Sequence, residues 1–123
     1  MTTNYAERIA EIDAYAIELR KLIPETVAAF GGLSKAAQIA GSLDKKTKEL
    51  LALAIAVAIR CEGCIAYHTH DAIKAGATRA ELLETIGIGV MMAGGPGTIY
   101  AAHALDAVDQ FLAEPPAISA SGG

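Results

Sequence analysis

Helix-start signals recur along this chain and constrain its fold more than any other feature. Capping side chains precede apolar residues at helical spacing in three places: Asn4 with Glu7, Asp44, and Thr78 with Glu81. Ala, Leu and Ile supply most of the apolar mass, and only 5% of residues are aromatic. No run alternates between apolar and polar residues as a half-buried strand does. The sequence therefore predicts an all-α fold, a single-domain bundle of about six helices.

The 123 residues are enough for one domain and too few for two. We expect the helical domain to cover residues 4–112 and residues 113–123, rich in Pro, Ser and Gly, to form a flexible tail. Gly31-Gly32 is expected to interrupt the second helical segment, with Ser34 capping a short continuation. The last helix is expected to begin near Thr98, after a glycine-rich turn.

Charge and hydropathy exclude two classes of partner. The net charge is −4 and no clustered basic face is visible, which argues against nucleic-acid binding. The longest clean apolar run, Leu50 to Ile59, has ten residues, whereas a membrane span needs about 20. The mean hydropathy of +0.36 is better explained by apolar surface buried between subunits. Because residues 1–7 lack a basic segment followed by an apolar one, we expect no signal peptide and a cytoplasmic protein.

Two cysteines and one histidine carry the chemistry that the sequence suggests. Cys61 and Cys64 are three residues apart, and His68 follows Cys64 by about one helical turn. Disulfide chemistry needs an attacking thiolate, a second thiol and a proton acceptor, and this segment supplies all three. Two inert core thiols are one alternative. A zinc site that adds His70 is a weaker one, because His68 and His70 diverge by about 200° on a helix.

Around these residues the chain resembles a known family. The pattern is Glu, eleven residues, Cys, two residues, Cys, three residues, His, which Glu49, Cys61, Cys64 and His68 match. Over about residues 20 to 112 the sequence is similar to the alkylhydroperoxidase D-like, or carboxymuconolactone decarboxylase, family. The later segment Gly-Gly-Pro-Gly-Thr-Ile-Tyr-Ala-Ala-His also resembles short members of this family.

The resemblance implies an all-helical antioxidant peroxidase or disulfide reductase that needs no cofactor or metal. By that likeness Cys64 attacks a small peroxide or disulfide, and Cys61 resolves the adduct to a disulfide. Glu49 and His68 form a proton relay that activates Cys64. A dithiol donor, such as lipoamide or a thioredoxin-like protein, then reduces the disulfide. Family members of this length are typically homo-oligomers, often hexamers built as trimers of dimers.

The sequence departs from the family pattern at one position. The best-known peroxidases of the family carry a second histidine between the cysteines, whereas Gly63 precedes Cys64 here. Two other functions stay open at this point. One is a non-redox lyase or decarboxylase that acts on a small carboxylactone with His68 and Glu49 as acid and base. The other is a non-catalytic redox sensor module.

Spacing alone does not bring Glu49 to the thiols. On one continuous helix Glu49 would lie about 18 Å from Cys61. The chain must therefore fold back near Gly63, or two helices must cross so that Glu49 meets His68. His103, in the last helix, is interpreted as a structural histidine, with a place in the pocket as the alternative.

Overall fold

The computed structural model describes residues 3–114, and that part of the chain contains helices and no strands. Six helices follow one another: α1 (Tyr5–Leu22), α2 (Pro24–Gln38), α3 (Lys45–Ala58), α4 (Glu62–Lys74), α5 (Arg79–Ala93) and α6 (Gly95–Ala113). The prediction of an all-α fold of about six helices is confirmed. Of the predicted tail, Ala113 belongs to α6, and residues 115–123 lie outside the described residues.

The predicted caps begin three of the helices. The Asn4 side chain accepts a hydrogen bond from the Glu7 N–H at the start of α1. The Asp44 carboxylate accepts one from the Thr47 N–H at 2.8 Å, and Thr78 forms the predicted capping box at the start of α5. Each cap supplies an acceptor for a backbone N–H group that the helix itself leaves unpaired.

The expected interruption of α2 is wrong, because this helix continues through Gly31-Gly32 to Gln38. A glycine in a helix costs about 1 kcal/mol relative to alanine, which weakens a helix without ending it. Ser34 does not cap a new segment; its hydroxyl oxygen instead accepts a hydrogen bond from Gln38 Nε2 at 2.8 Å within the same helix.

The last helix begins three residues earlier than expected, at Gly95 rather than Thr98. Gly94 has a φ of 74°, a conformation that favours glycine, and it turns the chain out of α5. Pro96 then stands in the first turn of α6, where its missing N–H leaves no hydrogen bond unmade.

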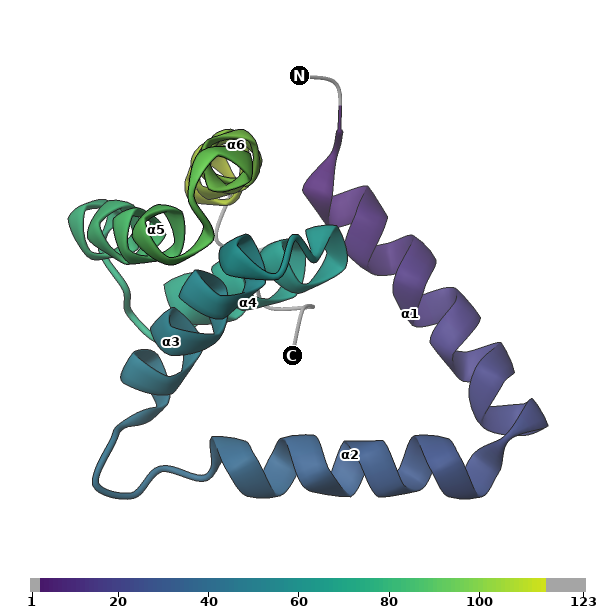
Figure 1. The fold of residues 1–123 in the computed structure, drawn as a ribbon. Helices are drawn as coiled ribbons and strands as arrows, with labels where there is room; N and C mark the ends of the chain where they lie inside the picture. The colour runs from purple at the N-terminus through teal and green to yellow at the C-terminus, as the bar shows by residue number, and fades with distance from the viewer. Residues whose placement is uncertain (1–2, 115–123) are drawn as a thin grey trace.

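Helices α3 and α6 each pack against α4 and α5, and α1 lies against α4 and α6 (Figure 1). Figure 1 also shows α2 running apart from the bundle before the chain returns to α3. The core is built mainly from small and aliphatic side chains: Tyr5, Leu53, Ala56, Val57, Ile65, Ala66, Ala72, Ala77, Leu82, Ile86, Ala104, Ala107, Val108 and Phe111. Helices α3 and α5 approach closely at Gly89, where an added Cβ would lie 2.9 Å from the Ala54 carbonyl oxygen.

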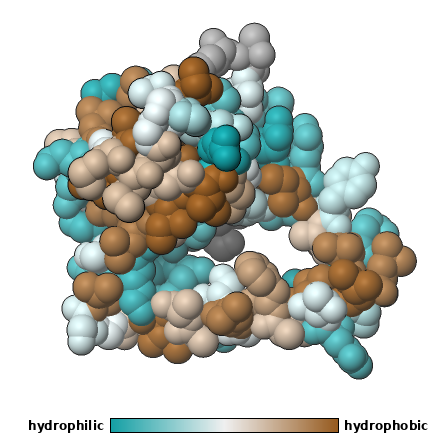
Figure 2. Space-filling model, in the orientation of Figure 1, coloured by the Kyte–Doolittle hydropathy of each residue, from teal (hydrophilic) through white to brown (hydrophobic). Residues whose placement is uncertain are grey.

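Much apolar surface is exposed on this single chain. Helix α2 contains no buried residue, and Phe30 and Leu33 on it are 69% and 65% exposed. In α3 the apolar run is buried on one face only, because Leu51 and Ile55 are about half exposed. Figure 2 shows brown, apolar residues gathered on α2 and on the bundle face above it. None of the helices in residues 3–114 has the length and apolar character that a membrane span requires.

Candidate active site

The two cysteines form a disulfide at the point where α4 begins. Cys61 is the N-cap of this helix, and its sulfur accepts a hydrogen bond from the Cys64 N–H at 3.3 Å. The chain reaches this position through Arg60, whose φ of 59° makes the sharp turn between α3 and α4. The chain therefore folds back close to Gly63, between the end of α3 at Ala58 and the start of α4 at Glu62. The cysteine pair lies at the N-terminus of α4, where the backbone dipole would favour a thiolate.

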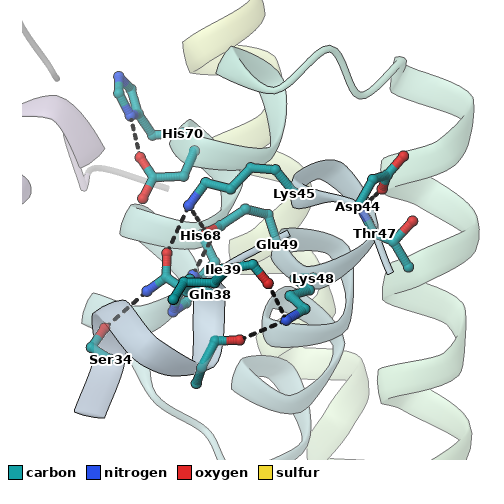
Figure 3. Close-up of polar contacts among 12 residues, drawn as sticks. Ser34, Gln38, Ile39, Asp44, Lys45, Thr47, Lys48, Glu49, His68 and His70 are labelled. Carbon is teal, nitrogen blue, oxygen red and sulfur yellow. Dashed lines mark hydrogen bonds and ion pairs between the residues drawn. The ribbon is translucent and has the colours of Figure 1, made fainter. Parts of the chain in front are cut away.

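Glu49 and His68 meet because α4 folds back along α3. The Glu49 side chain is 1% exposed, and its Oε2 lies 2.8 Å from His68 Nδ1 (Figure 3). The two residues are 19 positions apart in the sequence, so only the packing of the two helices brings them together. His68 itself is partly exposed, so its ring links a buried carboxylate to the surface near the disulfide.

Lys45, one turn before Glu49 on α3, completes this group of charges. Its ammonium donates to Glu49 Oε1 at 3.2 Å. Burial acts to raise the pKa of Glu49, but the hydrogen bond and charge of His68, together with Lys45, outweigh it and hold the pKa below its usual value. Glu49 is therefore a carboxylate at neutral pH, and it orients the imidazole with Nδ1 toward itself.

The four predicted site residues form two joined pairs. Cys61 is bonded to Cys64, and Glu49 is hydrogen-bonded to His68. Among residues 3–114 no hydrogen bond links the imidazole to either sulfur, and Nε2 of His68 has no hydrogen-bond partner. Because His68 stands one turn after Cys64 on α4, the ring occupies the same side of the helix as that cysteine.

Helix α1 covers the turn between the cysteines. A Cβ added at Gly63 would lie 3.1 Å from Ile12 Cδ1, so any side chain there would press on α1. One turn further along α4, the Tyr67 hydroxyl bonds to Asp13, also on α1. The space that a side chain at position 63 would need is thus already occupied by Ile12.

Three further polar residues, Glu62, Tyr5 and His103, meet at the start of α4, and for only one of them, His103, was a place in the pocket considered, as an alternative. Glu62 Oε1 accepts from the Tyr5 hydroxyl at 2.8 Å, and Glu62 Oε2 lies 2.7 Å from His103 Nδ1. His103 was interpreted as a structural histidine, and its pairing with Glu62 agrees with that interpretation while placing the ring near the cysteine segment. The one sequence feature that could have indicated this group is the acidic residue Glu62 between the two cysteines. Its partners are 57 and 41 residues away along the chain, so spacing could not reveal them.

His70 does not join the cysteines, which removes the histidine that the zinc alternative needs. Its Nδ1 pairs with Asp71 at 3.0 Å, and its ring packs edge-on against Phe111, with ring centroids 5.3 Å apart. The His70 side chain is only 12% exposed, so these contacts hold it mostly buried.

A different trio, Glu49, His68 and Asp71, has ligand-type atoms within 4.8 Å of one another. The Lys45 ammonium already holds Glu49 at 3.2 Å and would compete with a cation for this carboxylate.

Fold and site together define a class: an all-helical protein with a redox-capable Cys-x-x-Cys turn beside a buried carboxylate–imidazole pair. A family model, the carboxymuconolactone decarboxylase family, matches residues 24–107. The chain belongs to this family, which confirms the resemblance seen in the sequence.

Relatives and solved structures agree with this membership. An uncharacterized protein of Cupriavidus necator is 42% identical over 105 residues, covering 85% of this chain and 93% of its own length. A crystal structure of a carboxymuconolactone decarboxylase family protein from Legionella pneumophila aligns with a TM-score of 0.83 and 47% identity, over 87% of this chain and 96% of that one. A Thermotoga maritima member with a suggested role in the antioxidative response aligns with a TM-score of 0.68 and 27% identity, over 80% and 90%.

Proposed function

We propose that this protein is a thiol-dependent antioxidant enzyme that reduces small peroxides or disulfides through Cys61 and Cys64. The observation that carries the proposal is the 2.8 Å contact between buried Glu49 and His68, on the side of α4 that also bears Cys64. Membership of the family and the suggested antioxidative role of the Thermotoga maritima relative support it.

In the proposed cycle Cys64 is the attacking thiol. Its thiolate attacks a peroxide oxygen, the O–O bond breaks, and the leaving alkoxide takes a proton to become an alcohol or water. Cys64 is then a sulfenic acid. The Cys61 thiol displaces its hydroxyl group, which leaves as water, and the disulfide seen in the structure forms. A dithiol donor gives two electrons and two protons to this disulfide, is itself oxidised to a disulfide, and restores both thiols.

The carboxylate–imidazole pair supplies what the helix dipole cannot. A free thiol has a pKa near 8.5, so only a few per cent is thiolate at about pH 7. A helix N-terminus contributes about 0.3–1 kcal/mol, which is less than one pKa unit. We assign His68 as the group that takes the Cys64 proton, with Glu49 stabilising the imidazolium that results.

The extensive exposed apolar surface supports a further part of the proposal, that the protein is a homo-oligomer, with a hexamer made as a trimer of dimers as the family resemblance suggests. Helix α2 buries none of its side chains within one chain, yet it presents Phe30 and Leu33 to solvent. An apolar face of this kind is typical of an interface between subunits. We also infer that the protein works in the cytoplasm, where a dithiol donor is available.

Cysteine variants test the proposal. With hydrogen peroxide or a small disulfide as substrate and dihydrolipoamide as donor, Cys64→Ser is expected to abolish turnover. Cys61→Ser is expected to allow one oxidation event without efficient turnover. Full activity in Cys64→Ser would contradict the assignment. Lactone decarboxylation that survives in the double Cys→Ser variant would favour the lyase alternative, in which Glu49 and His68 act without the thiols.

A further inference from the structure

A second carboxylate–imidazole pair lies at the same turn and takes no part in the mechanism above. The Glu62 carboxylate is held from both sides, by the Tyr5 hydroxyl of α1 at 2.8 Å and by His103 Nδ1 of α6 at 2.7 Å. Glu62 and His103 are only 25% and 30% exposed, so water screens this pair less than it would a surface ion pair.

The two pairs lie on different sides of α4. Residues 62 and 64 are about 200° apart around a helix, so the Glu62 side chain points away from Cys64. Their contacts agree with this geometry, because His68 meets α3 through Glu49, whereas Glu62 meets α1 and α6. Glu62 is instead the immediate neighbour of Cys61, the N-cap of the helix.

The surroundings of the second pair are rich in ionisable groups. Tyr5 is fully buried, and its burial, together with the bond to Glu62, raises the pKa of its hydroxyl, which therefore stays a hydrogen-bond donor. Arg8 from α1 and Asp106 from α6 also act on Tyr5. Asp106 Oδ2 is buried without a hydrogen-bond partner in the described part of the chain. On α6 the Tyr100 ring lies beside His103, with centroids 5.2 Å apart.

We propose that Glu62 and His103 are positioning residues that set the protonation of Cys61, as Glu49 and His68 do for Cys64. The inference rests on the proposed redox function and adds a second, separate acid–base pair to it. When Cys61 displaces the hydroxyl group of the Cys64 sulfenic acid, its S–H proton must leave. When a dithiol donor reduces the disulfide, Cys61 must regain a proton. The Glu62 carboxylate, on the residue that follows Cys61 and paired with the His103 imidazole, acts on both events through its negative charge.

Single-cysteine variants test this proposal without any need for turnover. Cys64→Ser leaves Cys61 as the only thiol, and its pKa is measured from the rate of iodoacetamide alkylation against pH. In this background, His103→Gln removes the imidazole that pairs with the Glu62 carboxylate, whereas Glu62→Gln removes the negative charge. The Cys61 pKa is expected to be about one pH unit higher in the His103→Gln protein than in the Glu62→Gln protein, with the unsubstituted pair between them.

The matched control is Cys61→Ser, which leaves Cys64 as the only thiol. In this control protein, His103→Gln and Glu62→Gln are each expected to change the Cys64 pKa by less than a third of the change that they cause at Cys61. His68→Gln, in contrast, is expected to change the Cys64 pKa strongly. Equal Cys61 profiles in the His103 and Glu62 variants, or equal shifts at both cysteines, would overturn the proposal. If His103→Gln does not fold, His103→Asn replaces it. Failure of the peroxidase assays with these pKa shifts intact would reject the proposed function and leave this inference standing.

Discussion

Replacing Glu49 by glutamine keeps the size of the side chain and removes the charge that His68 faces. The bond lost is charge-assisted, 2.8 Å long, and made by a carboxylate that is 1% exposed. Hydrogen bonds to charged groups contribute about 1.5–3 kcal/mol. If that stabilisation applies to the imidazolium formed when His68 takes the Cys64 proton, the reaction slows by about 10- to 150-fold, since 1.36 kcal/mol is a factor of ten.

The assay is stopped-flow reaction of reduced Cys64 with a chromogenic aryl disulfide, in a Cys61→Ser background at neutral pH. Glu84→Gln is the matched control, because it makes the same chemical change at an exposed position of α5. We expect the control to react at the native rate and Glu49→Gln to fall into the slower range. A Glu49→Gln protein that folds normally and reacts within twofold of native would refute the reasoning.

Three other predictions concern stability and assembly. Gly89→Ala places a Cβ 2.9 Å from Val57 Cβ, so we expect the free energy of unfolding to fall by about 1–3 kcal/mol and the melting temperature to fall with it. At the control position Gly87, where an added Cβ meets nothing within 4 Å, alanine should leave the stability unchanged or raise it. Because the fold lowers the pKa of Glu49 from its ordinary value of 4.5, the Glu49 carboxylate stabilises the protein above pH 4.5, and this stabilisation is lost as the pH falls through the lowered pKa. The stability of Glu49→Gln, followed by circular dichroism, should therefore fall less steeply with acid than that of the native protein. Phe30→Asp should lower the mass seen by light scattering; an unchanged mass would exclude α2 from the interface.

Local chemistry explains how much of the fold the sequence could predict. The starts of α1, α3 and α5 were predictable because Asn4, Asp44 and Thr78 satisfy backbone groups within four residues of themselves. The continuity of α2 was not, because Gly31-Gly32 weakens a helix by an amount that neighbouring turns can offset. A helix cap, which acts within one turn, can therefore be predicted from the sequence. Whether a helix continues through glycines depends on a balance of small free energies, which the sequence alone does not reveal.

The candidate site divides in the same way. Cys61, Cys64 and His68 are close in sequence, so one helix was enough to group them. Glu49 reaches His68 only because α4 folds back on α3, and along one continuous helix it would have been distant from these residues. Glu62 drew no attention in the sequence because its partner His103 comes from α6, and no local pattern joins the two.

The most direct test of the central claim counts thiols during a single oxidation. Reduced native protein is mixed with one equivalent of hydrogen peroxide or of an organic hydroperoxide, and free thiols are titrated as the reaction proceeds. We expect two thiols to disappear per peroxide, faster than in free cysteine, with an intramolecular Cys61–Cys64 disulfide as the product found by mass spectrometry. Oxidation no faster than that of free cysteine, or a stable product without that disulfide, would contradict it.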